Sequence, residues 1–424
     1  MRHKMILGDP VLVHAAPVDE ATSRWGVYCI PKLWRRMDGT LVVRLNGAED
    51  TGRLLEAAPN LYFLSEDEGK TWRFVPDGER EFAEDIPFFS NINPLFTRLR
   101  NGDTVGFRRL CRPAVRGVSP RKHFPNACGS NAVNVYRWGD IQGRYAGLAF
   151  VRCRAGRETA VEITLDCPEL EVAANAAYYE DGREIATPVS LWGNDFCSPY
   201  PTALTELHDG TFAALFHAQS PLVEDRVCEN VYFAVSETGK DWRIRALAAD
   251  GGRMDTRSGA VADGAEMSLT QTEDGTLLIA LRNDCSLGEP HFCDCTLIRS
   301  KDNGYSWSEP VSVSDSSVTP HILSFPDNCA VLITGRPGVH CRLSEDGGES
   351  FGEPLSVIGD GLAAELAKGK TYLEAKYTAT SSYSNTFVER LTPDTCLLVY
   401  NDLQYDPGDG LAHKAAFVRT LTVV

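Results

Sequence analysis

One short motif recurs four times in this chain and constrains its fold more than any other feature. The copies are SEDEGKTW from Ser65, SETGKDW from Ser236, SKDNGYSW from Ser300 and SEDGGESF from Ser344, and the second is one residue short. Oxygens of Ser and Asp side chains accept hydrogen bonds from backbone N–H groups in turns. Glycine adopts backbone conformations that are closed to most residues. The motif therefore predicts a structural hairpin turn, to which we assign no catalytic role.

Six further segments have the form apolar strand, tight turn, apolar strand, which predicts β-hairpins. They begin at Ile30, Ile92, Ser198, Ala265, Thr319 and Ser382. Because most of them precede two further strands, we expect an all-β fold, a six-bladed β-propeller of four-stranded blades. A β-sandwich or a pair of β domains is the alternative, but repetition at intervals of roughly 50 to 100 residues favours the propeller.

The ends of the chain are expected to complete a single domain over residues 1–424. The N-terminal MILGDPVLVH is predicted to pair into the last blade beside the C-terminal HKAAFVRTLTVV and so close the ring. In the second blade, VNVYRWGD and YAGLAFVRC are predicted to supply the outer strands. The segment GLAAELAKGK near Gly361 is the best helix candidate.

Composition argues against two classes of partner, nucleic acids and membranes. The formal net charge of −16 disfavours nucleic-acid binding. No apolar run is long enough to span a bilayer, so we expect no membrane partner. We find no signal peptide, which makes the cytoplasm the simplest location. The 13 cysteines form no recognisable disulfide framework or zinc-site spacing, and we interpret them as buried thiols.

Hairpin geometry predicts which residues share a face of the propeller. The start of each first strand and the end of each second strand lie opposite the Asp-Gly turns, at one mouth of the central channel. The residues at these positions are Cys29, Asn91, Asn93, Asp195, Tyr200, Glu266, His321 and Tyr383 at strand starts, and Arg44, Asp50, Arg108, Arg109, His217, Arg282, Arg336 and Asp402 at strand ends. A dense ring of charge indicates a binding site, whereas a solvated loop face is the alternative.

The ordered set of charged residues in the last three hairpins resembles the sialidase (neuraminidase)-like superfamily, whose propellers carry Asp-box (BNR) turn repeats. Glu266 is followed across one hairpin by Arg282, Arg336 precedes the turn motif at Ser344, and Tyr383 lies in SSYSNTFVERL. The resemblance implies an exo-acting glycoside hydrolase with Tyr383 as nucleophile, Glu266 as its base, and Arg282 and Arg336 as substrate-binding residues. The repeats extend the similarity over nearly the whole chain.

The first blade departs from this family pattern. The family begins that blade with Arg-Ile-Pro, where the Arg binds substrate, but this chain has Cys29-Ile30-Pro31. Arg24 and Arg44 are nearby, outside the motif position, and Arg44 is a candidate replacement. Asp50 is the best match by position for the general acid, with Glu49 beside it. Asp195, at a strand start, is a further candidate substrate-binding residue.

The chemistry of these residues is coherent with a terminal, acidic sugar as substrate. A neutral phenol avoids the repulsion that a carboxylate nucleophile would meet from a substrate carboxylate. Its ordinary pKa near 10 requires a neighbouring base, here Glu266. Arginines hold a carboxylate by charge-assisted hydrogen bonds, and Asp50 would protonate the leaving oxygen. The scheme needs no metal and no organic cofactor, and a carbohydrate is the expected partner.

A structural, non-catalytic role is the alternative for each of these residues. Tyr383 can be an aromatic residue at a strand edge with its hydroxyl exposed to solvent. Arg282 and Arg336 can be structural ion-pair partners, for which Glu266 is a candidate, and Asp50 can be a turn residue. His123, in the second blade's long insertion, lies on the candidate face but is more simply a loop residue. A non-catalytic glycan- or protein-binding propeller with a decayed pocket is the main alternative function, and a polysaccharide lyase is a weaker one.

Overall fold

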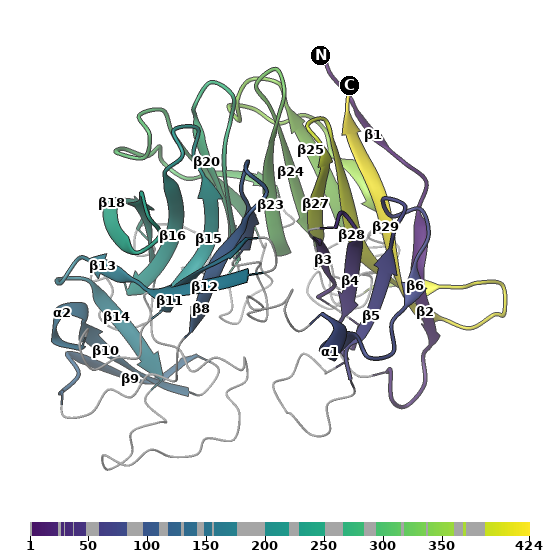
Figure 1. The fold of residues 1–424 in the computed structure, drawn as a ribbon, viewed down its shortest axis with the longest axis horizontal. Coiled ribbons are helices and arrows are strands. Elements are labelled where there is room, and N and C mark those ends of the chain that lie inside the picture. The colour runs from purple at the N-terminus through teal and green to yellow at the C-terminus, as the bar shows by residue number, and fades with distance from the viewer. Residues whose placement is uncertain are drawn as a thin grey trace.

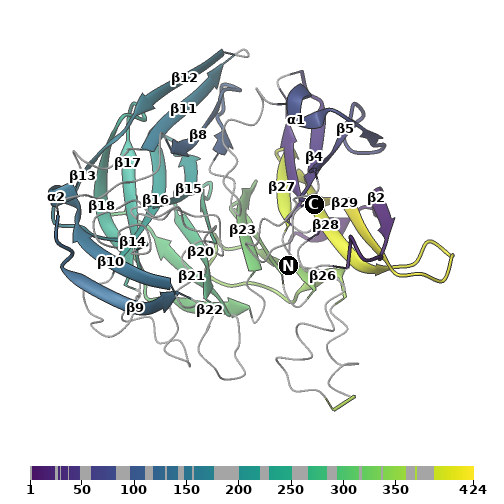
Figure 2. The same ribbon diagram turned by 90° about the horizontal axis from the view of Figure 1, so that it is seen from below.

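The chain forms a six-bladed β-propeller, as the hairpin repeats predict (Figures 1 and 2). A computed structural model describes residues 2–23, 27–28, 30–36, 38–47, 59–82, 96–109, 118–128, 131–141, 148–154, 157–175, 200–219, 229–250, 266–283, 294–314, 318–335, 338–359, 368–369 and 386–424. Each of the six predicted hairpins supplies the first two strands of one sheet.

The first three blades are built as follows, from the inner strand outward. Blade 1 has β3 (Lys32–Arg35), β4 (Leu41–Leu45), β5 (Leu61–Ser65) and β6 (Arg73–Phe74), followed by α1 (Gly78–Glu81); blade 2 has β7 (Phe96–Arg98), β8 (Thr104–Arg109), β11 (Leu148–Arg154) and β12 (Arg157–Glu162); blade 3 has β15 (Tyr200–Glu206), β16 (Phe212–Gln219), β17 (Glu229–Ser236) and β18 (Asp241–Ala249), with β13 (Thr164–Asp166) parallel to β18.

The other three blades follow the same plan. Blade 4 has β19 (Met267–Gln271), β20 (Leu277–Asn283), β21 (Asp294–Ser300) and β22 (Val311–Ser314); blade 5 has β23 (Val318–Phe325), β24 (Cys329–Gly335), β25 (Val339–Ser344) and β26 (Leu355–Ile358); blade 6 has β27 (Phe387–Thr392), β28 (Thr395–Tyr405) and β29 (His413–Val423). Both N-terminal strands, β1 (Met5–Leu7) and β2 (Val11–Pro17), pair antiparallel with β29 in blade 6.

The second blade differs from the sequence-based expectation. The sequence predicts VNVYRWGD as an outer strand of this blade, but its first five residues lie in β10 (Asn131–Arg137), which forms a separate sheet with β9 (Lys122–Cys128) and β14 (Glu171–Asn175). The short connection from β9 makes β10 pair locally, and α2 (Trp138–Ile141) follows it. The outermost strand of the blade is β12, whose side chains are mostly exposed, so it carries little apolar signal.

Apolar side chains are buried mainly between neighbouring blades. Between blades 3 and 4, Leu215 and Phe233 pack with Leu277 and Ile279. The same kind of cluster joins blade 6 to blade 1 and completes the ring. The inner strands β15, β19 and β23 pack in succession, as do β27 and β3. This packing fixes the positions of the inner strands, whose ends carry the candidate site.

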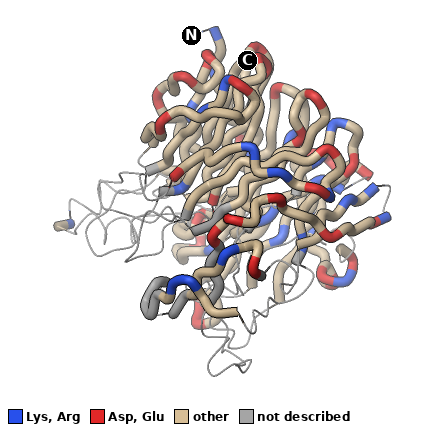
Figure 3. Tube along the Cα trace, turned by 90° about the vertical axis from the view of Figure 1, so that its left-hand side faces the viewer, with Lys and Arg blue, Asp and Glu red and all other residues tan. Residues whose placement is uncertain are grey.

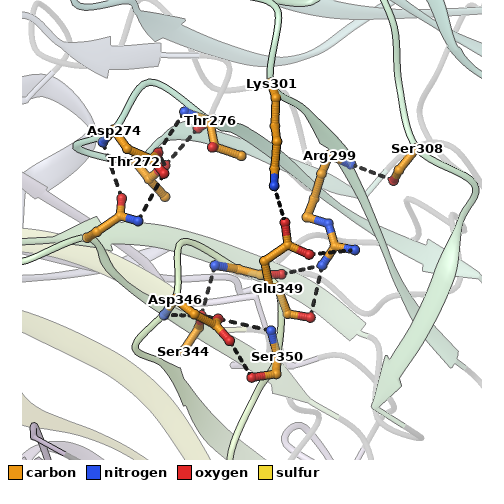
Figure 4. Close-up of polar contacts among 12 residues, drawn as sticks. Thr272, Asp274, Thr276, Arg299, Lys301, Ser308, Ser344, Asp346, Glu349 and Ser350 are labelled. Atoms are coloured by element: carbon orange, nitrogen blue, oxygen red, sulfur yellow. Dashed lines mark hydrogen bonds and ion pairs between the residues drawn. The ribbon is translucent and has the colours of Figure 1, made fainter.

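The recurring turn motif has the hydrogen bonds that the sequence predicts. In the third copy the Ser300 hydroxyl donates to Asp302 (2.8 Å) and accepts from the Gly304 N–H (2.8 Å), while Asp302 accepts from the Ser306 N–H and hydroxyl. These bonds, the Ser306 hydroxyl first, lower the pKa of Asp302 to about 2. Figure 4 shows the same arrangement around Asp346. The motif is therefore structural.

The motif turns lie at the end of the propeller that holds the Asp-Gly turns and both termini. Leu41, which follows the Asp38-Gly39 turn, pairs with Ser65, and Met5 pairs with Val423 beside the turn at Asp394. Figure 3 shows acidic residues at several turns of this end. The opposite end is where first strands begin, and it carries the predicted site.

We expect Gly304→Ala to destabilise the fold by about 2–4 kcal/mol. Gly304 has φ +84°, which is costly for an L residue, and an added Cβ would lie 2.3 Å from the Phe233 ring of the neighbouring blade. Gly210 has φ +86°, and an added Cβ there would have no atom within 4 Å, so Gly210→Ala is the matched control and should cost about 1–2 kcal/mol. Urea denaturation measures the free energy of unfolding of both variants. An equal loss in Gly304→Ala and Gly210→Ala would contradict the role of packing against Phe233.

Candidate active site

Glu266 and Arg282 meet at the predicted mouth, in blade 4. Glu266 directly precedes β19, and its backbone carbonyl accepts a hydrogen bond from the Arg282 N–H (3.0 Å). Arg282 Nη1 lies 2.9 Å from Glu266 Oε2, and the two side chains are 15% and 5% exposed. A buried ion pair of this kind is a charge-assisted hydrogen bond that holds the carboxyl group in one orientation. The hairpin register therefore brings together two of the residues that the sequence singles out.

A third group, from blade 5, completes the surroundings of this carboxyl group. The backbone N–H of Thr319 donates to Glu266 Oε2 at 2.7 Å. Among the described residues, both side-chain contacts of the Glu266 carboxyl thus involve Oε2. These two contacts therefore fix one oxygen of the carboxyl group from two different blades.

The backbone is strained at two strand starts on this face. Thr319 has φ +41° and Ile30 has φ +52°, conformations that β-branched residues rarely adopt. Tyr28, on the other side of Cys29 from Ile30, has φ +62°. Each such residue costs about 1–3 kcal/mol, and strain of this kind clusters at functional sites. The strain thus marks the starts of blades 1 and 5 as candidates for function.

The start of blade 6 is tied to the same strand of blade 5. The Thr386 N–H donates to Thr319 Oγ1 (3.1 Å), and the Thr386 carbonyl lies 2.8 Å from His321 Nε2. Burial lowers the pKa of His321 to about 4, so the imidazole is neutral and donates its Nε2 hydrogen to this carbonyl. The buried ammonium of Lys32, in blade 1, lies 4.2 Å from the Phe387 ring centroid.

The other predicted site residues divide into two groups. Arg44 lies in β4, where burial lowers its pKa while electrostatic interactions with Tyr62 and Glu79 act in the opposite direction. Tyr383, Asp50, Arg336 and Asp195 lie outside the described residues. Two of their neighbours in sequence are at the expected end, because Gly335 pairs with Val318 and Thr386 directly precedes β27. The roles of these residues remain predictions.

His123 belongs to a strand and not to a loop. It lies exposed in β9, and its Nδ1 is 2.7 Å from Asn134 Oδ1 in β10. Asn134 in turn donates to the Tyr136 hydroxyl at 3.2 Å. The histidine thus takes part in a polar network within the separate sheet.

Sequence reasoning placed His321 on the candidate face but missed Thr319 and Lys32. Thr319 contacts Glu266 through its backbone N–H, which every residue except proline carries. The residue type at this position therefore gives no indication of the contact. Lys32 stands three residues after Cys29, and a lysine directly after Ile-Pro at a strand start was a signal that could have been used.

The free energy of unfolding is expected to fall more steeply on acidification than it would without the buried imidazole of His321. Its pKa is lowered to about 4 in the fold, against about 6.5 when unfolded, so between these values the unfolded chain binds the extra proton. Stability from this group is present above pH 6.5 and is lost as the pH falls, by about 2 kcal/mol at pH 5. His321→Gln keeps a donor and cannot titrate; urea midpoints from pH 7 to pH 5 should decline less for it. Equal slopes would contradict this assignment.

Comparison with known proteins bears on the fold. No protein-family model matches the sequence, and no curated protein matches it. A solved structure of an unknown function protein from Dyadobacter fermentans is 15% identical, covers 99% of each chain and has a TM-score of 0.54.

Solved sialidases are also among the similar structures. The Hadza microbial sialidase Hz136 is 14% identical over 97% of this chain and 68% of its own, with a TM-score of 0.45. The intramolecular trans-sialidase from Ruminococcus gnavus is 15% identical over 94% and 95%, with a TM-score of 0.44. At such identities the likeness concerns the fold, so any assignment of activity has to rest on the site itself.

None of the described residues forms a helix that is long and apolar enough to cross a membrane.

Proposed function

We propose that the protein is an exo-acting glycoside hydrolase that removes a terminal acidic sugar. The observation that carries the proposal is the buried Glu266 carboxyl, held through Oε2 by Arg282 and by the Thr319 N–H at the mouth of the propeller. A carboxyl oriented in this way suits a base that must accept a proton at one fixed oxygen. The resemblance in the last three hairpins supplies the partner that it would serve, Tyr383.

In the proposed reaction the Tyr383 oxygen attacks the anomeric carbon and its proton passes to Glu266. Asp50 gives a proton to the leaving oxygen as the glycosidic bond breaks. Water then attacks the anomeric carbon and loses its proton to Asp50, while Glu266 returns its proton to the released tyrosine oxygen. Both carboxyl groups thus regain their starting states, and no redox partner is needed.

Substrate binding is assigned to the remaining charged residues. Arg282 and Arg336 would hold the acidic group of the sugar, because guanidinium groups match carboxylates in geometry and charge. Arg44 is a candidate third cation in blade 1, and Asp195 a candidate acceptor for sugar hydroxyl groups. Lys32 adds a buried cation at the start of the same blade.

The proposal is tested by incubating the purified protein with a panel of chromogenic glycosides, including a sialoside, uronides and neutral sugars. Release of the chromophore by the wild type, and its loss in Glu266→Gln, is the expected result. A protein that binds these sugars without cleaving them would instead be the non-catalytic binding propeller, which the change to Cys29 favours. A lyase would yield an unsaturated, ultraviolet-absorbing product.

Specificity is expected to differ from that of a simple sialidase because Cys29 stands at the family's arginine position. Each charge-assisted hydrogen bond contributes roughly 1.5–3 kcal/mol, so one missing arginine lowers affinity by about one to two powers of ten. We expect weak or absent sialoside cleavage, faster cleavage of another acidic glycoside, and improved sialoside cleavage by Cys29→Arg. A wild-type kcat/KM on a sialoside of roughly 10⁴ M⁻¹s⁻¹ or more would contradict this expectation.

A further inference from the structure

The residue that begins blade 6 is held through both of its backbone polar groups by one neighbouring strand. Thr319 and His321 are two residues apart in β23, and their side chains reach the N–H and the carbonyl of Thr386, at 3.1 Å and 2.8 Å. Buried backbone N–H and C=O groups need hydrogen-bond partners, and here two side chains of one neighbouring strand supply them. Thr386 is thereby fixed relative to blade 5 before its own strand begins.

The same Thr319 also fixes the carboxyl group of blade 4. Its N–H donates to Glu266 Oε2 (2.7 Å) while its hydroxyl accepts from Thr386, so a single residue lies between the two. Thr319 does this with φ +41°, a conformation in which a β-branched residue is strained. The hydrogen bonds to Glu266 and Thr386 are among the contacts that offset this strain.

Packing supports the hydrogen bonds at this junction. The His321 ring lies edge-on to the Phe387 ring, with centroids 5.8 Å apart, and Lys32 Nζ lies 4.2 Å from the centroid of the same Phe387 ring. Charges on both Lys32 and Glu266 act on His321, the first lowering and the second raising its pKa. Blades 4, 5, 6 and 1 therefore meet at these side chains.

We propose that Thr319 and His321 are positioning residues that hold Glu266 and the start of β27 in one fixed relation, and so set the distance between Glu266 and the nucleophile. This inference rests on the proposed function, in which Tyr383 is that nucleophile. Tyr383 precedes Thr386 by three residues, a length of chain that spans at most about 11 Å. Fixing Thr386 relative to Glu266 thus limits where the phenol can lie.

The magnitude of the effect follows from the demands of the reaction. Displacement of a reacting group by about 1 Å can lower the rate about 100-fold, although binding is unaffected. A change at Thr319 or His321 should therefore act on kcat and leave KM nearly unchanged. A merely structural role would instead lower stability without this separation of kcat from KM.

The test compares Thr319→Val, which removes the hydroxyl, with Thr319→Ser, which keeps it. Thr202→Val is the matched control, because Thr202 is a buried inner-strand threonine of blade 3 whose hydroxyl donates to the Leu215 carbonyl. Each variant is measured by hydrogen exchange at the Thr386 amide and by kcat and KM on the glycoside that the panel identifies. His321→Leu and His321→Gln form a second pair, lacking and keeping the donor.

We expect Thr319→Val to speed exchange at Thr386 at least about tenfold and to lower kcat about 10–100-fold with KM within about twofold. Thr319→Ser and Thr202→Val should behave like the wild type, and His321→Leu like Thr319→Val. Wild-type exchange and turnover in both Thr319→Val and His321→Leu would overturn the inference. If the wild type cleaves no glycoside, the proposed function fails, and unchanged exchange at Thr386 would separately overturn the positioning role.

Discussion

Replacing Tyr383 by phenylalanine is expected to lower kcat on the cleaved glycoside by roughly 10³–10⁶-fold, as for other enzymes that lose their nucleophile. The change removes one oxygen from the side chain that we propose as nucleophile, so no covalent intermediate can form at this position. Binding of the sugar should persist, because the acidic group is assigned to the arginines. Steady-state kinetics together with calorimetric binding of the substrate would separate the two effects.

The control for this change is Tyr305→Phe. Tyr305 is 64% exposed, lies in the turn motif at the opposite end of the propeller and stacks with Arg245. Its loss of a hydroxyl should leave turnover unchanged. A Tyr383→Phe variant that keeps near-wild-type turnover would show that another group, or water, attacks the sugar.

Arg282→Met is expected to destabilise the protein by about 3–5 kcal/mol and to abolish turnover. The Glu266 side chain is only 5% exposed, so removal of its cation leaves a buried carboxyl with an uncompensated charge. Glu266→Gln in the same chain should recover much of the lost stability, because a neutral amide needs no cation. Turnover should not recover, since the amide cannot accept the proton.

Arg108→Met is the matched control for burial. Arg108 lies 2.7 Å from Glu158, closer than Arg282 to Glu266, but these side chains are 38% and 33% exposed. A solvated pair contributes only about 0.2–1 kcal/mol. Urea denaturation of the variants should thus rank Arg282→Met far below Arg108→Met, and similar losses for both would contradict the importance of the buried pair.

The architecture of this chain follows largely from local signals. Each blade begins with a hairpin whose turn and alternation are contained in about twenty residues, as in the segment from Ala265 that becomes β19 and β20. The separate sheet of β9, β10 and β14 was missed because β14 joins β10 from distant sequence. Nothing in VNVYRWGD distinguishes a strand of that sheet from a strand of a blade.

The site was predictable only where it depends on one hairpin. Glu266 and Arg282 meet because they occupy the two ends of one β-hairpin, a relation that the sequence contains. The contacts of Thr319 with Glu266 and Thr386 cross between blades and depend on a backbone N–H and on a left-handed φ. Neither a backbone N–H contact nor a left-handed φ is specific to one residue type, so these contacts can be recognised only in the folded structure.

Covalent trapping of the sugar on the enzyme is the most direct test of whether Tyr383 attacks the anomeric carbon. A substrate analogue with fluoride as leaving group and a second fluorine beside the anomeric carbon should form the glycosyl-enzyme faster than it is hydrolysed, because the second fluorine disfavours the cationic transition state of the hydrolysis step. Intact-mass and peptide mass spectrometry should then find one sugar attached to Tyr383. Wild-type protein that cleaves the parent glycoside but carries the label on another residue would contradict the account.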